Sequence, residues 1–71
     1  MSKDHLPQYS KTLKQLRELR GFSQSELARR ARLDRSFISM LESGARRGLS
    51  TRTLLSLAAA LDVTTDELLG R

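Results

Sequence analysis

The sequence contains no cysteine and no tryptophan, and it has one proline and three aromatic residues among its 71 positions. Without cysteine the chain cannot form a disulfide, a thiolate zinc site or a thiol nucleophile. No apolar run approaches the ~20 residues of a membrane span, and we expect no signal peptide before the domain. We therefore expect a cytoplasmic protein that does not bind a membrane and that is stabilised by helix packing and helix caps.

Motifs for catalysis are missing as well. The serines have no positioned histidine base, because the single histidine, His5, stands alone near the start of the chain. There is no Gly-rich phosphate loop, and three aromatic residues do not form a stacking platform for single-stranded nucleic acid. We expect no enzyme activity, no catalytic residues, no metal, no cofactor and no small-molecule substrate.

The net charge of +5 is unevenly distributed along the chain. Residues 1–52 contain twelve of the thirteen Lys and Arg residues against five acids, whereas residues 53–71 contain one Arg against three acids. A basic front and an acidic rear suit a module that binds a polyanion on one side. Charge alone leaves open the alternative that these basic residues simply make the helix surfaces soluble.

Cap residues and apolar spacing predict helices through most of the chain. Four segments pair a cap with a hydrophobic staple, and their caps are Ser23, Asp34, Ser50 and Thr64. In two of them an acidic partner, Glu26 or Glu67, completes a capping box. We expect Asp34 to cap its helix rather than to read cytosine. Together these signals predict five helices, at residues 9–20, 23–31, 34–43, 50–61 and 64–69.

The apolar residues Leu54, Leu57, Ala58 and Leu61 have the spacing of a helix with one buried face. No strand-like alternation and no internal repeat is visible. The predicted fold is therefore all-α, a compact five-helix bundle. Residues 1–8 show no periodicity and are predicted to form a flexible N-terminal arm, so that the domain spans residues 9–71.

Four motifs distributed over residues 9–69 are specific when taken together. They are Leu13-x-x-Leu16-Arg17, Gly21-Phe22-Ser23-Gln24-x-Glu26-Leu27-Ala28, Ile38-Ser39-x-Leu41-Glu42-x-Gly44 and Leu54-x-x-Leu57-Ala58-x-Ala60-Leu61-x-Val63. Through them the chain resembles the phage repressor and Cro-type helix-turn-helix family, which implies a lambda repressor-like DNA-binding domain. The run at residues 33–39, followed by Arg46 and Arg47, resembles more narrowly the controller proteins of restriction–modification systems. The family usually has glycine where this chain has Arg32, and a left-handed non-glycine residue costs roughly 1 kcal/mol.

The third predicted helix carries the expected base-reading residues. Ile38 and Leu41 face inward by helical periodicity, and the outward positions that face the groove in the family are Arg35, Ser36, Ser39, Met40 and Ser43. We expect Arg35 to bind O6 and N7 of guanine. For Ser36 and Ser39 the alternatives are contact with bases or phosphates and plain solvent exposure. Met40 either touches a thymine methyl group or closes the edge of the core.

Contacts to the DNA backbone are expected on both sides of this helix. The resemblance implies that Gln24 contacts a phosphate together with the N-terminus of its helix. Arg46 and Arg47 are expected to bind phosphates, with an ordinary basic loop as the alternative. Phe37 either packs beneath the groove-facing surface or rests against sugar and phosphate. The full predicted backbone set is Ser23, Gln24, Phe37, Ser43, Arg46 and Arg47.

Two further expectations concern structure and assembly. The family typically pairs an Arg of the first helix with a Glu that ends the third, and Arg17 and Glu42 match these positions. The resemblance therefore implies a partly buried, structural ion pair. A domain this small offers one recognition helix, so we expect a homodimer with Val63, Leu68 and Leu69 as interface candidates. The alternative for Leu68 and Leu69 is that they cover the core of the monomer.

The expected function is that of a sequence-specific transcriptional regulator, such as a repressor or a controller protein, that binds double-stranded DNA. We expect it to bind a palindromic operator as a homodimer through the helix at 34–43, on the nucleoid in the cytoplasm. The alternative is an antitoxin-type interaction protein that binds a toxin and autoregulates through the same domain. The lack of a long extension for wrapping a toxin counts against this alternative.

Overall fold

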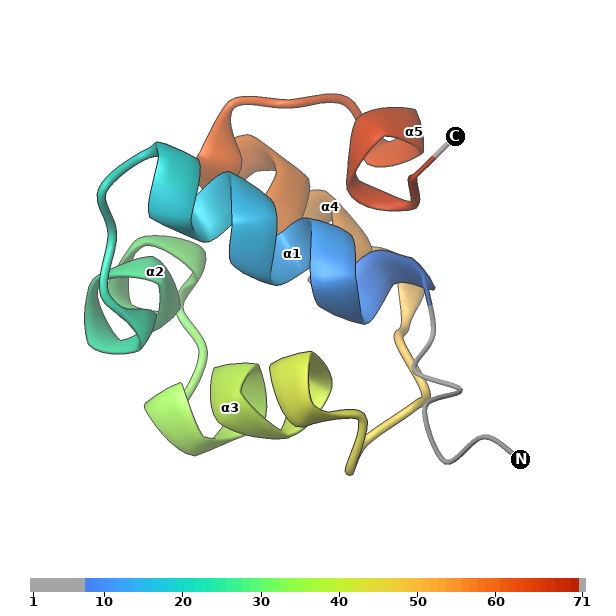
Figure 1. Cartoon of the computed structure of the whole chain (residues 1–71), viewed down its shortest axis with the longest axis horizontal. Coiled ribbons are helices and arrows are strands. Elements are labelled where there is room, and N and C mark those ends of the chain that lie inside the picture. The colour runs from blue at the N-terminus through green and yellow to red at the C-terminus, as the bar shows by residue number, and fades with distance from the viewer. Residues whose placement is uncertain (1–7, 71) are drawn as a thin grey trace.

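Five helices pack around one core in a computed structural model that describes residues 8–70 (Figure 1). They are α1 (Gln8–Leu19), α2 (Gln24–Ala31), α3 (Arg35–Ser43), α4 (Thr51–Leu61) and α5 (Thr65–Leu68). No residue of the range 8–70 is in a strand, so the predicted all-α fold is confirmed. Residues 1–7 of the predicted arm, with His5, and Arg71 lie outside the described residues. None of the five helices is long and apolar enough to cross a membrane.

The predicted helix boundaries differ from the observed ones by one residue at most ends. Four predicted ranges include the N-cap residue, which lies just outside the helix that it caps. α1 instead begins one residue earlier than predicted. Gln8, which was predicted to be the last residue of the arm, is its first helical residue. The backbone carbonyl of Gln8 accepts a hydrogen bond from the side-chain hydroxyl of Thr12, one turn later, at 3.2 Å.

Three of the four predicted side-chain caps are confirmed. The hydroxyl oxygens of Ser23, Ser50 and Thr64 each accept a hydrogen bond from the backbone N–H three residues later, at 3.0, 3.1 and 3.0 Å. At α5 the predicted capping box is complete, because the backbone N–H of Thr64 also donates to the Glu67 carboxylate, at 2.8 Å. Each cap satisfies a backbone donor that the helix itself leaves without an acceptor.

Two cap predictions are wrong. The Glu26 carboxylate does not close a capping box but accepts hydrogen bonds from Arg29 and Arg30, at 2.5 and 2.6 Å. Guanidinium groups form stronger, charge-assisted bonds than a backbone N–H, and these bonds lower the pKa of Glu26. Asp34 occupies the N-cap position of α3, but its side chain makes no capping bond. The first turn of α3 is closed by backbone bonds to the Asp34 carbonyl alone.

The core is formed by leucines and one isoleucine from all five helices. The apolar residues with at most 1% exposure are Leu13, Leu27, Ile38, Leu41, Leu57, Leu61 and Leu68, and burial of each contributes roughly 2 kcal/mol. α1 crosses the centre of the molecule and packs against α3 and α5, while α2 packs against α3 and α4 (Figure 1). Because Leu68 is buried in the monomer, its prediction as an interface residue is wrong. Its other predicted role, covering the core, is correct.

Candidate nucleic-acid interface

One face of α3 is buried and the other is open to solvent. Ile38 and Leu41 are fully buried on the inner face. The residues predicted to face outward behave as expected, since Arg35, Ser36, Met40 and Ser43 are exposed and Ser39 is half-buried. Met40 is 39% exposed, which leaves its thioether available at the surface rather than enclosed in the core. α3 therefore presents a row of polar and basic side chains that the fold does not cover.

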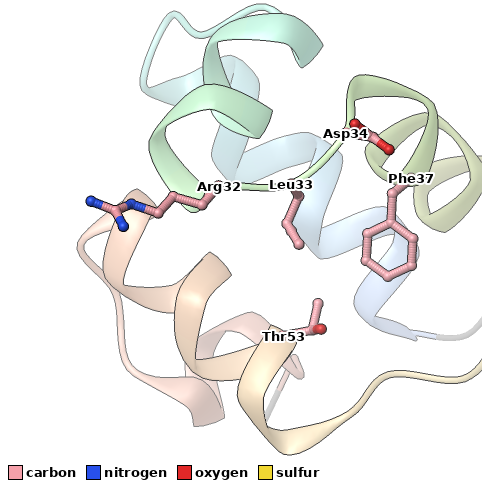
Figure 2. Close-up of a pocket in the computed structure, with 5 residues that line it drawn as sticks. All are labelled: Arg32, Leu33, Asp34, Phe37 and Thr53. Carbon is pink, nitrogen blue, oxygen red and sulfur yellow. The ribbon is translucent and has the colours of Figure 1, made fainter.

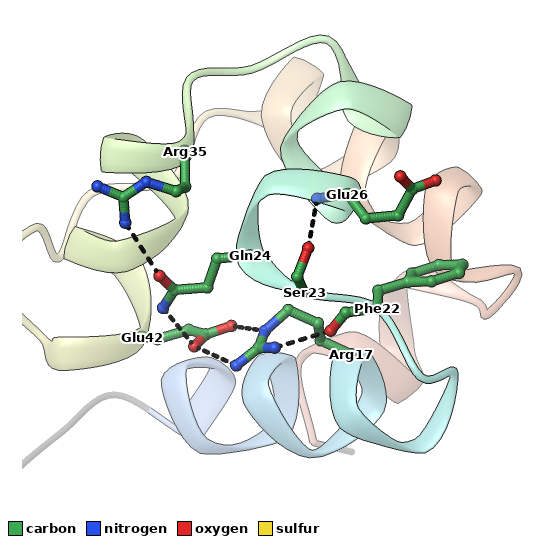
Figure 3. Close-up of polar contacts among 7 residues, drawn as sticks. All are labelled: Arg17, Phe22, Ser23, Gln24, Glu26, Arg35 and Glu42. Carbon is green, nitrogen blue, oxygen red and sulfur yellow. Dashed lines mark hydrogen bonds and ion pairs between the residues drawn. The ribbon is translucent and has the colours of Figure 1, made fainter.

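The predicted ion pair holds the C-terminal end of α3 against α1 (Figure 3). Arg17 donates to both carboxylate oxygens of Glu42, from Nε at 2.7 Å and from Nη2 at 3.1 Å, and each residue is 9% exposed. Its remaining amino group, Nη1, donates to the backbone carbonyl of Phe22 at 2.8 Å. The hydrogen bond to Glu42 raises the pKa of Arg17 despite the opposing effect of burial. The structure thus confirms a bidentate, largely buried pair that positions α3.

Gln24 connects this pair to the exposed face of α3. Its amide nitrogen donates to Glu42 at 3.1 Å, and its amide oxygen accepts from Nη1 of Arg35 at 3.3 Å (Figure 3). A carboxylate can only accept hydrogen bonds, so Glu42 determines that the amide nitrogen of Gln24 faces inward and its oxygen faces Arg35. The guanidinium of Arg35 is consequently held at the first turn of α3 with its other N–H groups free of Gln24.

The loop after α3 carries Arg46 and Arg47 and is held by an aromatic residue of α1. The hydroxyl of Tyr9 donates to the backbone carbonyl of Arg47, and also to that of Arg46 at 3.4 Å. Burial raises the pKa of Tyr9, and the nearby charges of Arg47 and Arg46 partly oppose this effect. Sequence analysis missed this contact, because nothing local connects residues that lie 37 and 38 positions apart.

Phe37 has the packing role that was one of its two predicted alternatives. Its ring is half-buried against the core, and the guanidinium of Arg46 lies over it with the carbon 4.8 Å from the ring centre. A cation in this position is attracted by the ring face. The aromatic ring therefore also supports one of the two arginines of the loop.

The two serines predicted to contact the DNA backbone have bonding partners within the fold. The Ser23 hydroxyl oxygen is used by the cap of α2. The Ser43 hydroxyl donates to the carbonyl of Met40 at 3.2 Å and accepts from the N–H of Ala45 at 3.3 Å. Both residues remain exposed. Their hydroxyl groups thus organise the ends of α2 and α3, and any contact with phosphate would be added to that role.

Two shallow hollows flank α3, and each contains a residue that sequence analysis did not select. The first hollow is lined by Lys14, Arg17, Gln24, Ser39, Glu42 and Ser43. The second is lined by Arg32, Leu33, Asp34, Phe37 and Thr53 (Figure 2). Lys14 is exposed, and its position one turn before Arg17 on α1 was the available signal. Thr53 comes from α4, and only the packing of α4 brings it to the second hollow.

Arg32 occupies the turn between α2 and α3 in the left-handed conformation, with φ 60° and ψ 47°. The turn geometry is intact, because the next residue, Leu33, donates its N–H to the carbonyl of Ala28 at 2.8 Å. In Figure 2 the guanidinium of Arg32 points away from Leu33 and Phe37. A non-glycine residue is therefore accommodated at this position without a change in the turn.

These features define the class of protein: two short helices joined by a tight turn, with the second helix anchored behind and exposed in front, form a helix-turn-helix DNA-binding domain. The chain belongs to the helix-turn-helix family, whose pattern matches residues 13–68. It is a DNA-binding transcriptional regulator.

Several solved structures share this fold. The chain is 40% identical to the restriction–modification controller protein C.AhdI from Aeromonas hydrophila, with a TM-score of 0.83 over 89% of this chain and 94% of that one. It is 34% identical to SinR, the master regulator for biofilm formation, solved in complex with DNA, with a TM-score of 0.83 over 86% and 97%. It is 31% identical to the hypothetical transcription factor NHTF from Neisseria, with a TM-score of 0.84 over 94% and 76%. No curated protein sequence matches the chain.

Proposed function

We propose that this protein binds double-stranded DNA sequence-specifically by inserting α3 into the major groove. The observation that carries this proposal is the exposed, polar outer face of α3, which is fixed from behind by the Arg17–Glu42 pair. A helix held in this way presents its side chains to base edges at a defined depth and angle. A rigid scaffold is what sequence reading requires, because displacement of the helix would break the geometry of each base contact.

Within this interface the residues have different proposed roles. Arg35, held by Gln24, reads guanine through its planar fork, and Ser36, Ser39 and Met40 contact neighbouring base pairs. The residues proposed to bind sugar and phosphate are Ser23, Gln24, Phe37, Ser43, Arg46 and Arg47. Phosphate contacts position the protein on the duplex without specifying its sequence.

We propose that the active form is a homodimer on a palindromic operator with half-sites about one helical turn, ~34 Å, apart. Val63 and Leu69 are half-buried in the monomer and remain interface candidates. The structure adds Leu55, which is 56% exposed on the outer face of α4. A large apolar side chain that is exposed in the acidic part of the chain, residues 53–71, favours contact with a protein partner there.

The relatives suggest the biological setting. C.AhdI is a restriction–modification controller, and SinR is a master regulator. We propose that this chain acts in the cytoplasm as a repressor or controller protein of the same kind. The antitoxin interpretation takes second place, because no contact or surface in residues 8–70 favours it.

The test compares two alterations of the interface. Selection of bound duplexes from random DNA first identifies the preferred sequence of the unaltered protein. Arg35→Ala should then lose about 1–3 kcal/mol of discrimination at one base pair in each half-site. Arg46→Ala combined with Arg47→Ala should instead weaken binding to all duplexes and reduce the salt dependence, by about one unit of slope per lost phosphate contact.

Each alteration has a result that would contradict its assignment. If Arg35→Ala weakens binding to every duplex equally, Arg35 contacts the backbone and does not read bases. If the double arginine variant keeps the salt slope of the unaltered protein, the loop after α3 does not touch DNA.

A further inference from the structure

Tyr9 is a buried residue of α1 whose hydroxyl reaches a functional loop rather than the core. The residue is 9% exposed, and its ring belongs to the hydrophobic cluster. The hydroxyl donates to the backbone carbonyls of Arg47 and Arg46, the two arginines of the loop after α3. The side chain of a helix outside the helix-turn-helix thus fixes the backbone of the proposed phosphate-binding segment.

The same loop is attached to α3 on its other side. The N–H of Arg46 donates to the carbonyl of Met40 at 3.1 Å, and the N–H of Gly44 donates to the carbonyl of Leu41 at 3.4 Å. The guanidinium of Arg46 rests over the ring of Phe37. Residues 44–47 are therefore held between α1 and the C-terminal end of α3, although none of them is in a helix.

The direction of the Tyr9 hydrogen bond determines which way the loop peptide faces. No peptide bond in the described part of the chain is cis. In a trans peptide the C=O and N–H groups point in opposite directions. Because the Arg47 carbonyl points to Tyr9, the N–H of Gly48 points away from α1. Gly48 itself is exposed, and an added Cβ there would meet nothing within 4 Å.

We propose that Tyr9 is a positioning residue for DNA binding, which orients the 46–48 segment so that a DNA phosphate can bind there. The arginine side chains supply the positive charge, and the N–H of Gly48 supplies a backbone donor. This inference rests on the proposed function. Without the hydroxyl the loop would lose its attachment to α1, and ordering it on the DNA would then cost conformational entropy.

The test uses Tyr9→Phe, which keeps the ring in the core and removes the hydroxyl alone. The matched control is Ser10→Ala, which removes a neighbouring buried hydroxyl that donates to the carbonyl of Leu41 in α3, at 2.5 Å, and not to the 46–48 segment. Binding is measured on a labelled duplex selected by the unaltered protein and on a duplex of unrelated sequence. Both measurements are made over a series of salt concentrations, at a temperature where thermal unfolding shows each variant to be folded.

Tyr9→Phe should bind both duplexes about tenfold more weakly, because one or two loop residues must then be ordered when the protein binds DNA. Its salt slope should be smaller, and its ratio of specific to unspecific binding should be unchanged. Ser10→Ala should lower the melting temperature but keep the salt slope. If folded Tyr9→Phe has the affinity and slope of the unaltered protein, the hydroxyl only stabilises the fold and the proposal is wrong.

A double-mutant cycle separates this proposal from the proposed function. In the Arg46→Ala, Arg47→Ala background, Tyr9→Phe should have much less effect on DNA affinity, because the groups that it positions are mostly gone. A full additional tenfold loss would show that Tyr9 acts by another route. If the arginine changes alone leave the salt slope unaltered, the proposed contact of the loop with DNA has failed, whatever Tyr9 does.

Discussion

Gly21, Arg32 and Asp62 take the left-handed conformation within two residues of the end of a helix, with φ of 75°, 60° and 57°. The next residue in each case is hydrophobic, and its N–H donates a hydrogen bond to a backbone carbonyl of the preceding helix. The residue after that is the N-cap of the following helix. The same three-residue device therefore ends one helix and starts the next at three places. Glycine fills the left-handed position only once, so the other two sites are held by packing and hydrogen bonds at a conformational cost.

Arg32→Gly should stabilise the protein by up to about 1.6 kcal/mol. Relief of the left-handed conformation contributes roughly 1–2 kcal/mol, and the greater freedom of glycine in the unfolded chain removes about 0.4–1 kcal/mol of this. Gly21→Ala is the reverse control, because an added Cβ there meets nothing within 4 Å and the change acts through conformation alone. Urea unfolding should give a higher midpoint for Arg32→Gly and a lower one for Gly21→Ala. A lower midpoint for Arg32→Gly would mean that the arginine side chain itself stabilises the turn.

At the scale of elements, one polar chain joins the three helices that build the DNA-binding unit. It runs from the Phe22 carbonyl through Arg17 of α1 and Glu42 of α3 to Gln24 of α2, and ends at Arg35 (Figure 3). Hydrophobic packing alone fixes the distance between helices more strictly than their rotation. The directional bonds of this chain fix the rotation of α3, and with it the side chains that face the groove.

Arg17→Met should cost about 3–5 kcal/mol, because it leaves the buried carboxylate of Glu42 without its main partner. Arg17→Met combined with Glu42→Met should lose much less, since no unpaired charge remains buried. Glu26→Ala, which breaks exposed pairs, should have a far smaller effect. Chemical denaturation of the four proteins provides the comparison. Equal losses in the single and double variants would show that the cost comes from packing and not from the unpaired charge.

At the scale of the whole molecule, the proposed homodimer can be tested on the outer face of α4. Arg52, Leu55 and Ala59 of α4 and its C-cap residue, Asp62, are exposed, and neither charged side chain forms an ion pair within residues 8–70. Suppose that two copies pack through these residues, antiparallel and related by a two-fold axis. Leu55 of one copy then lies against Ala59 of the other. The same packing places Arg52 opposite Asp62, which is the arrangement that an isologous dimer requires.

This register predicts the outcome of a charge exchange. Arg52→Asp or Asp62→Arg alone should weaken the dimer, because each brings like charges together at both ends of the interface. The two changes in one chain should restore dimerisation, since opposite charges meet again. Sedimentation over a range of concentrations measures the result. Failure of the double variant to recover, or no response to either single change, would place the dimer interface elsewhere.

The sequence by itself determined the elements. Caps and apolar periodicity act within four residues of each other, so five helices and three side-chain caps followed from local patterns. The resemblance to a family added the Arg17–Glu42 pair. In α5, four residues are too few for periodicity to decide which of the adjacent Leu68 and Leu69 faces inward.

Only the tertiary structure decided which distant groups meet. It gave Leu68 to the core, and it gave the hydroxyl of Tyr9 to the loop of Arg46 and Arg47. The physical reason is that a polar group takes the strongest partner within reach, and helix packing determines what is within reach. Local sequence specifies where the recognition helix lies in the chain, and the packing of α1 against it determines how firmly it is held.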